Sequence, residues 1–266
     1  MCPTYLDIVL YYGCMSEKKQ GFGIDIGGSG IKGAHVDLGT GEFIGKRLKM
    51  KTPQPATPEA IADCVADIVH QKEWDGPVGI CMPSVIRNQT ALSAANIDKS
   101  WIGVNARELF SSRLEGREVT VLNDADAAGL AEVRHGLPES REGAVIFLTI
   151  GTGIGSAFFI DGQLFPNTEI GHLIVGKKEA EHQASSAVKD KEELSFKKWS
   201  KRIDTVLHEY EKLFNPSLFV VGGGISRDHE KWVPRLTIKT PVKPAQLLNT
   251  AGIVGAAMAL DGSVAP

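Results

Sequence analysis

The chain has 266 residues, 42% of them apolar, which is enough to bury a hydrophobic core without disulfide or metal staples. Its 29 basic residues are nearly balanced by 32 acidic ones, and a net charge of -3 argues against a nucleic-acid partner. No stretch approaches the roughly 20 apolar residues of a membrane span, so we expect no membrane partner either. The four cysteines, Cys2, Cys14, Cys64 and Cys81, show no metal-binding spacing and fit a cytoplasmic location.

Residues 1–18 differ in pattern from the rest of the chain. They include a short apolar run over 5–12, but no Lys or Arg precedes it and no small-residue cleavage site follows it. These two features argue against a signal peptide. We therefore expect this segment to be a disordered extension.

The first half of the remaining chain predicts a β-hairpin, a helix and further strands. The strands are expected over 21–24, 31–38, 42–48, 77–82 and 117–122. Thr57 is a suitable N-cap for a helix that has Pro58 at its first position and apolar residues at helical spacing after it. An Ala-rich helix is expected over 124–135.

The second half repeats this order, with strands expected over 143–150, 156–160 and 217–221 and helices over 196–213 and 251–260. A highly charged segment over 177–198 predicts an exposed loop and the start of a helix. The repetition predicts two similar α/β domains that face each other across a cleft. We place them at 19–123 and 124–249, with a helix over 250–262 that can return to the first.

Two glycine-rich turns carry the first functional signal. One follows Asp25 at 27–30 and the other follows Thr149 at 151–155, each after an apolar strand. Glycines let backbone N–H groups converge on an anion, above all on phosphate. The turns predict a phosphate chain held from both sides, and two tight hairpins without a ligand are the alternative. A dinucleotide site is not indicated, because no helix signal follows the first turn.

A pair of polar residues, Asn123 and Asp124, comes at the end of a predicted buried strand. Ligands of α/β sheets collect at the carboxyl ends of strands, where an Asp can accept a proton from a hydroxyl group. The alternative is that Asp124 or Asp126 serves as the N-cap of the following helix. We favour the catalytic role for Asp124.

Further polar residues predict a ligand with hydroxyl groups. Glu169 and His172 are three positions apart and can converge on one ligand, although a polar loop is the alternative. Asn96 lies in a polar loop, where it either binds a hydroxyl or closes a turn. Glu181 and His182 suggest a metal site with His172, but without a nearby cysteine we do not expect structural zinc.

A basic run has Lys or Arg at 46, 47, 49 and 51. Such a run is typical of a solvated edge strand. It can also guide a polyanion toward a cleft.

Five ordered motifs resemble the ROK family of sugar kinases. They are DIGG at 25–28, NDA at 123–125, GTGIG at 151–155, EIGH at 169–172 and GGGIS at 222–226. The resemblance covers about 21–260. The sequences over 25–33 and 92–101 are most similar to members that use polyphosphate as phosphoryl donor.

The resemblance implies an actin-like (ribonuclease H-like) duplicated α/β fold with the active site in the cleft. It implies transfer of a phosphoryl group to the 6-hydroxyl of glucose, from polyphosphate and also from ATP, with Mg²⁺ held through Asp25. Asp124 aligns with the catalytic base. The sugar contacts would be Asn96, Asn123, Asp124, Glu169, His172 and Glu181. The donor contacts would be Asp25, Gly27, Gly28, Ser29, Lys32, Thr152, Gly153, Gly223 and Gly224.

One departure from the family concerns zinc. Many members bind zinc through a cysteine cluster after the EIGH-type motif, whereas 173–200 contains no cysteine here. We therefore expect no zinc. Alternatives that remain open are an ATP-only hexokinase acting on glucose, mannose or another hexose, and a sugar-binding regulator. The apolar C-terminal helix and family habit predict a homodimer.

Overall fold

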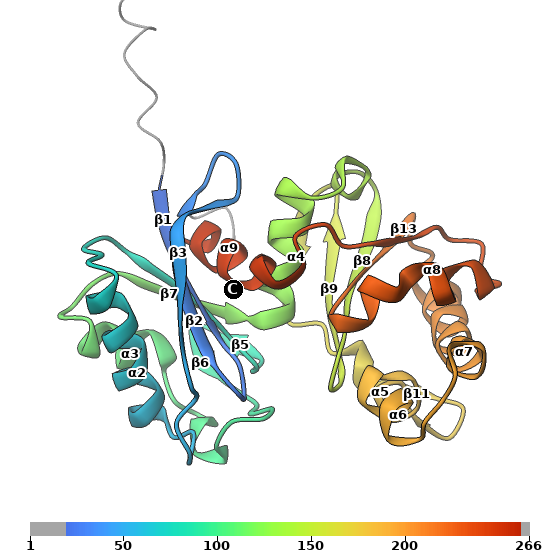
Figure 1. The fold of residues 1–266 in the computed structure, drawn as a ribbon, viewed down its shortest axis with the longest axis horizontal. Helices are drawn as coiled ribbons and strands as arrows, with labels where there is room; N and C mark the ends of the chain where they lie inside the picture. Colours follow the sequence, from blue (N-terminus) through green and yellow to red (C-terminus); the bar gives the residue numbers. More distant parts are fainter. Residues whose placement is uncertain (1–19, 262–266) are drawn as a thin grey trace, which may run out of the picture.

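The protein is described by a computed structural model that covers residues 20–261, so the predicted extension over 1–18 lies outside the described residues. Two five-stranded sheets form two lobes, with a pair of helices between them (Figure 1). No helix within 20–261 combines the length and apolar character that crossing a bilayer requires.

The first sheet confirms the predicted strands of the N-terminal half. Its strands are β1 (Gln20–Ile26), β2 (Ile31–Asp37), β3 (Glu42–Met50), β4 (Val78–Met82) and β7 (Val119–Asn123), in the order β3-β2-β1-β4-β7. The hairpin strands β1, β2 and β3 pair antiparallel, whereas β1, β4 and β7 pair parallel. Every residue of β4 and β7 is buried, as expected for central parallel strands. The basic run lies on β3, which is an exposed edge strand as predicted.

Two helices, α2 (Pro58–Gln71) and α3 (Ala106–Arg113), pack in the hydrophobic core of this lobe. The predicted start of α2 is confirmed, because the hydroxyl of Thr57 accepts a hydrogen bond from Ala60 N–H and Pro58 takes the first position. Burial of the apolar side chains of α2 fixes this helix against the sheet.

The second sheet repeats the first in topology. Its strands are β8 (Ala144–Ile150), β9 (Ile154–Ile160), β10 (Gln163–Phe165), β13 (Leu218–Gly222) and β14 (Val242–Pro244), in the order β10-β9-β8-β13-β14. Helix α7 (Phe196–Phe214) packs in the core of this lobe and ends at Asn215, whose φ of 45° is left-handed. A left-handed residue at this position terminates the helix.

The sheets are joined through α4 (Asp124–His135) and α9 (Ala251–Met258), which pack against each other. Helix α9 also packs on β1 and β4, and α4 packs on β9 (Figure 1). The helices approach closely, since a Cβ on Gly255 would lie 1.7 Å from the carbonyl oxygen of Ala127. Helix α9 is largely buried within the chain, and the predicted homodimer stays a prediction. The division of the chain at 123 and 124 stays a proposal.

The sequence over 177–198 predicts an exposed loop and the start of a helix. The start of a helix is confirmed at Phe196, where α7 begins, but the prediction of a loop before it is wrong. Strands β11 (Ile174–Val175) and β12 (Lys178–Glu179) form a hairpin, followed by α5 (Glu181–Ala184) and α6 (Ser186–Lys191). Ala184 is buried and its carbonyl accepts a hydrogen bond from the indole of Trp199, which holds α5 against α7. The high charge of this segment suggested a loop, but contacts with the rest of the lobe stabilise α5 and α6.

The remaining elements are short. They are β5 (Ile86–Arg87), β6 (Thr90–Ala91), α8 (His229–Trp232) and the 3₁₀ turns Lys99–Trp101, Pro138–Arg141, Ile170–His172, Gly224–Asp228, Val233–Arg235, Leu248–Thr250 and Ala259–Asp261.

Candidate active site

A cavity of about 750 Å³ lies between the lobes and is lined from both of them. Its walls include Ser84, two residues after the end of β4, and Asn123, the last residue of β7; these two strands are parallel. On the second lobe they include the turn between β8 and β9. The carboxyl ends of parallel strands are the usual place for a ligand in an α/β sheet.

Nine of the predicted site residues line this one cavity: Asn96, Asn123, Asp124, Thr152, Gly153, Glu169, His172, Glu181 and Gly223. Six others do not line it: Asp25, Gly27, Gly28, Ser29, Lys32 and Gly224. Gly28 nevertheless lies beside the wall, because a Cβ there would come within 3.0 Å of Asn96.

Asp124, the first residue of α4, has the environment of a proton acceptor. Its carboxylate faces the cavity but is otherwise enclosed by protein, and this burial raises its pKa to about 6. The negative charge of Asp25 raises the pKa further, whereas the backbone N–H of Ala125, 2.8 Å from Oδ1, opposes the shift. A carboxyl group with this pKa is ionised at neutral pH and close to the range where proton transfer is efficient.

Asn123 is the N-cap of α4, so the alternative in which Asp124 or Asp126 caps the helix is wrong. Asn123 Oδ1 accepts hydrogen bonds from Ala125 N–H at 2.8 Å and Asp126 N–H at 3.2 Å. Its Nδ2 donates to the carbonyl of Ser84 at 3.1 Å. These bonds fix the end of β7 to the end of β4, and Asp124 is thereby oriented. A direct contact of Asn123 with sugar stays a prediction.

The acidic wall of the cavity is organised around His172. Its Nδ1 lies 2.9 Å from Glu179 Oε2 and 3.8 Å from Glu181 Oε1, and its Nε2 lies 3.9 Å from Glu169 Oε2. The hydrogen bond with Glu179 is the main reason that the pKa of His172 is raised. Burial raises the pKa of Glu169. The wall thus combines a protonatable imidazole with carboxylates, a set suited to binding sugar hydroxyls.

Glu179 is the residue that the sequence analysis missed. Its position two residues before Glu181 was the feature of the sequence that could have identified it as a neighbour of the site. Single donor atoms of His172, Glu179 and Glu181 lie within 4.8 Å of one another, so they also form a possible metal-ligand set. The expectation that zinc is absent stays a prediction.

Both glycine turns are closed by a backbone hydrogen bond, from Gly27 N–H to Gly30 O at 3.1 Å and from Gly151 N–H to Gly153 O at 3.0 Å. The second turn lies against the acidic wall, where a Cβ on Gly153 would come within 2.4 Å of Glu181 Oε2. A side chain at Gly153 would therefore have to displace the Glu181 carboxylate.

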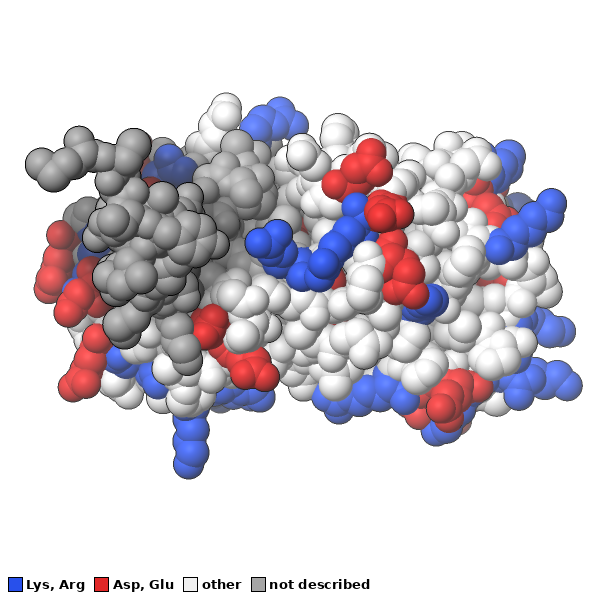
Figure 2. All heavy atoms as spheres, turned by 90° about the horizontal axis from the view of Figure 1, so that it is seen from above, with Lys and Arg blue, Asp and Glu red and all other residues white. Residues whose placement is uncertain are grey.

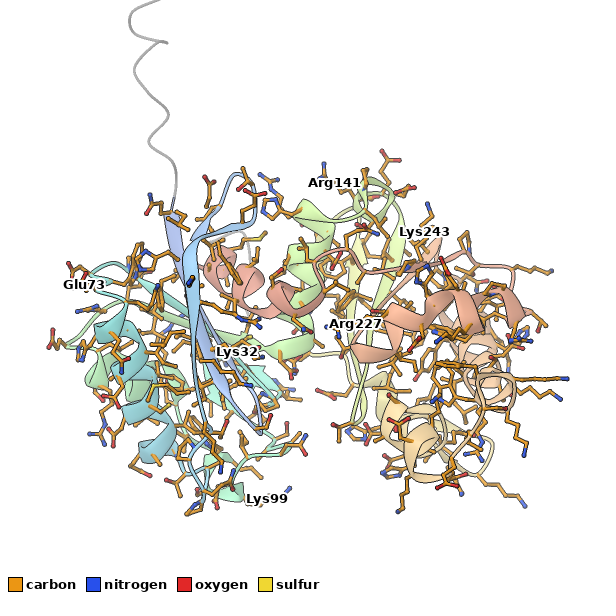
Figure 3. All side chains as sticks on the ribbon, in the orientation of Figure 1. Lys32, Glu73, Lys99, Arg141, Arg227 and Lys243 are labelled. Atoms are coloured by element: carbon orange, nitrogen blue, oxygen red, sulfur yellow. The ribbon has the colours of Figure 1, made fainter. Side chains whose placement is uncertain are left out.

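Lys32 and Asp25 lie opposite each other on β2 and β1, and Lys32 Nζ is 2.7 Å from Asp25 Oδ2. Figure 3 shows Lys32 in the first lobe and Arg227 in the second. The ion pair leaves Asp25 Oδ1, 3.9 Å from the thiol of Cys81, as the carboxylate oxygen that has no ionic partner among residues 20–261.

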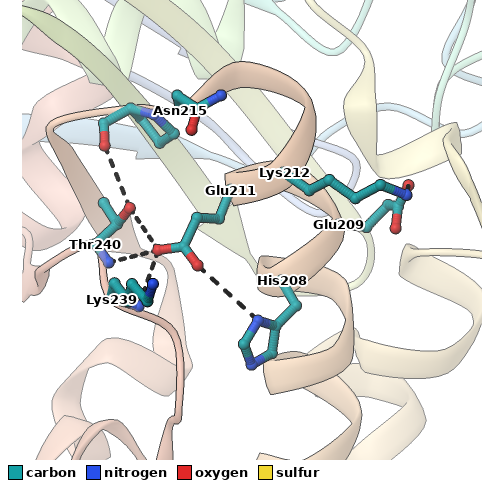
Figure 4. Close-up of a pocket in the computed structure, with 8 residues that line it drawn as sticks. His208, Glu209, Glu211, Lys212, Asn215, Lys239 and Thr240 are labelled. Atoms are coloured by element: carbon teal, nitrogen blue, oxygen red, sulfur yellow. Dashed lines mark hydrogen bonds and ion pairs between the residues drawn. The ribbon is translucent and has the colours of Figure 1, made fainter.

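A second hollow lies at the C-terminal end of α7, away from the predicted site residues (Figure 4). Glu211 there accepts hydrogen bonds from the backbone N–H groups of Lys239 and Thr240 and from the Thr240 hydroxyl. Its carboxylate therefore anchors the 239–240 segment to α7, which is a structural role.

Comparison with known proteins agrees with this geometry. The sequence profile of the ROK family matches residues 21–186. The polyphosphate glucokinase of Mycobacterium tuberculosis is 56% identical over 244 residues, which is 92% of this chain and 92% of that protein. The structure of the inorganic polyphosphate/ATP-glucomannokinase from Arthrobacter sp. strain KM is similar with a TM-score of 0.86 at 46% identity, covering 92% of this chain and 99% of that chain.

A more distant structure is that of a ROK family glucokinase from Streptomyces griseus in complex with glucose and AMPPNP. It has a TM-score of 0.76 at 26% identity and covers 90% of this chain and 98% of that chain. With the duplicated sheets, these similarities confirm the predicted actin-like α/β fold.

Proposed function

This chain belongs to the ROK family, and on that premise we propose that it transfers a phosphoryl group from inorganic polyphosphate to the 6-hydroxyl of glucose. ATP is a second donor in this proposal. The observation that carries it is the position of Asp124, whose carboxylate opens only onto a cavity walled by both lobes.

In the proposed reaction, Asp124 accepts a hydrogen bond from the 6-hydroxyl and takes its proton as the oxygen attacks the terminal phosphorus. The bond from that phosphorus to the bridging oxygen of the donor breaks, and the shortened polyphosphate or ADP leaves. The transition state of phosphoryl transfer is loose, so positioning and charge neutralisation contribute more than base strength.

Glucose is held by the polar wall of the cavity. Asn96 comes from the first lobe, and Glu169, His172 and Glu181 come from the second. Carboxylates and an imidazole accept and donate hydrogen bonds to several hydroxyls of one ring. Because both lobes contribute, closure of the lobes over the sugar would exclude water and suppress hydrolysis of the donor.

The donor is held between the two glycine turns. In this arrangement the backbone N–H groups of Gly28 and Ser29 face those of Thr152 and Gly153, with Gly223 and Gly224 beside the leaving group. The N–H of Gly27 closes the first turn by its bond to Gly30 O, so Gly27 contributes through the shape of the turn. Two cationic side chains support the first turn. Lys49 lies over it, since a Cβ on Gly30 would meet Lys49 Cε at 2.7 Å, and Lys49 pairs in register with Lys32.

Magnesium fits this donor site, because carboxylate oxygen is a preferred ligand and Asp25 Oδ1 has no ionic partner within the described part of the chain. Asp25 would hold the ion, directly or through water. When bound, Mg²⁺ would neutralise charge on the phosphate oxygens of the donor.

An extended polyphosphate chain requires further cations. Figure 2 shows the molecule from above relative to Figure 1. Basic and acidic side chains are interspersed on the part of this face where the described residues are visible, and they form no continuous basic track there. The candidates are Lys32, Arg227 and the basic run over 46–51, of which Lys49 lies over the first turn. Lys231 is a weaker candidate, because its Nζ is 2.6 Å from Asp228 Oδ1.

The proposal includes a cytoplasmic location and a homodimer. Cys64 and Cys81 are buried free thiols, which supports a reducing compartment. Because α9 is largely buried within the chain, the proposed homodimer is argued from the habit of the family alone. Sedimentation of the purified chain tests it directly.

The deciding experiment is a coupled glucose 6-phosphate assay with Mg²⁺, comparing long-chain polyphosphate with ATP. Turnover with polyphosphate is expected. Turnover with ATP alone would favour the ATP-only hexokinase, and no turnover with either would favour a sugar-binding regulator. Asp124→Ala should lower kcat by about a hundredfold to ten-thousandfold, the range for a lost general base. Asp67→Ala, an exposed position on α2, is the matched control.

A further inference from the structure

The side-chain amide of Asn167 joins the two lobes. Asn167 Oδ1 accepts a hydrogen bond from Ile86 N–H at 2.8 Å, and Asn167 Nδ2 donates to Ile86 O at 2.7 Å. Both backbone groups of Ile86 are thus paired by one side chain, as a neighbouring strand would pair them. Ile86 belongs to the first lobe, at the start of β5, whereas Asn167 follows β10 of the second.

The backbone of the same residue is held by a second buried group. Asp126 Oδ2 accepts a hydrogen bond from Asn167 N–H at 2.8 Å, and Asp126 is a buried residue that is only 1% exposed. Asp126 lies in the first turn of α4, two residues after the proposed base. Helix α4, β5 and the segment that begins at Asn167 therefore meet at one point.

That segment carries Glu169, a proposed glucose contact. On its far side, the hydroxyl of Ser156 donates to Thr168 O at 2.6 Å and accepts from Ile170 N–H at 3.3 Å. Glu169 therefore stands between two anchors, one on β9 of its own lobe and one at the junction with the first lobe. Release of the junction would leave Glu169 attached to the second lobe alone.

We propose that Asp126 and Asn167 form an interlobe clasp that positions Glu169 for glucose. The inference rests on the proposed function, since it concerns the sugar half of the same cavity. Both are positioning residues, because they act through the backbone of the 167–170 segment. The clasp therefore governs glucose affinity more than phosphoryl transfer or donor binding.

Asn167→Gly tests the clasp with little backbone strain. The φ of Asn167 is 60°, and glycine adopts this left-handed conformation readily while losing both bonds to Ile86. The KM for glucose should rise about tenfold, the scale expected for lost buried hydrogen bonds. The kcat and the KM for polyphosphate should stay within about twofold. Asn215→Gly is the matched control, because Asn215 is an exposed left-handed residue at the end of α7, and it should leave all constants unchanged.

Substitutions of Asp126 test the second half of the clasp. Asp126→Ala removes the acceptor for Asn167 N–H and should raise the KM for glucose, whereas Asp126→Asn retains a carbonyl acceptor and should restore it. In the double variant Asp126→Ala with Asn167→Gly, the increases should be less than multiplicative because both changes break one unit.

Two outcomes would overturn the clasp while the proposed function stands. One is wild-type glucose affinity in Asn167→Gly. The other is a combined change in Asn167→Gly, in which kcat and thermal stability fall and the KM values for both glucose and polyphosphate rise, while Asp126→Asn fails to restore the KM for glucose. This combination would indicate general misfolding. If the wild-type chain forms no glucose 6-phosphate with either donor, the proposed function fails and the clasp fails with it.

Discussion

The imidazole Nδ1 of His172 lies 2.9 Å from a carboxylate oxygen of Glu179, on the rim of the cavity that holds the proposed base. The hydrogen bond occupies one ring nitrogen and leaves Nε2 on the side of Glu169, 3.9 Å away. Glu179 therefore selects the orientation of a proposed sugar contact.

Replacement of Glu179 should lower the pKa of His172. The hydrogen bond raises the pKa of His172 above its ordinary value, so the imidazolium form persists to higher pH. The pair therefore stabilises the fold fully below about pH 6.5, and this stabilisation is lost as pH rises through the pKa of the folded state. In Glu179→Gln the NMR titration of the His172 ring should move to lower pH. An unchanged titration would show that the bond is not formed in solution. Glu192→Gln, which affects the pair with Arg202, is the control.

The ionised carboxylate of Asp124 should lower the free energy of unfolding at neutral pH. Burial raises its pKa from 3.8 to about 6, so the folded state loses stability as pH rises between the unfolded and folded values. Asp124→Asn should therefore increase the free energy of unfolding by up to about 2 kcal/mol at pH 7, after allowance for the opening to the cavity. At pH 3 the increase should vanish. Urea denaturation at both pH values measures it, and an equal change at both would exclude the ionisation as the cause.

The contact between α4 and α9 should tolerate no side chain at Gly255. A Cβ there would lie 1.7 Å from the carbonyl oxygen of Ala127, so Gly255→Ala must separate the helices. We expect a loss of about 3 kcal/mol or more in the free energy of unfolding, at the upper end of overpacking effects. Gly252→Ala lies on the same helix, but its Cβ would meet Asp25 at an ordinary 3.4 Å. Thermal unfolding should separate the two variants, and similar melting temperatures would argue against the observed helix packing.

Lys49 should contribute to polyphosphate use but little to ATP use. It lies over the first glycine turn, so Lys49→Gln should lower kcat/KM for polyphosphate about threefold to fivefold at low salt, as for an exposed charge interaction. The difference should disappear near 1 M salt, where the screening length falls to about 3 Å. Lys46→Gln, an exposed position on the same strand, is the control. Equal effects of both variants on both donors would argue against a track at the turn.

The local features of this protein were predictable because they depend on residues a few positions apart. Thr57 and Pro58 start α2, Asn215 ends α7, and apolar runs form the central strands, as their own sequences indicate. The glycine turns and the order of five motifs identified the family, and nine of the predicted site residues line the cavity.

The tertiary structure decided features that depend on distant partners. Asn123 caps α4 instead of either Asp because Ser84, 39 positions away, fixes its amide. Helices α5 and α6 form in a charged segment because α7 anchors them. Asn167 binds Ile86 at a separation of 81 positions. The spacing of apolar residues and the capping signals in a sequence depend on neighbours within one or two helical turns. The bonds named above form only after the two sheets and helices α4 and α9 have packed together, so no local pattern predicts them.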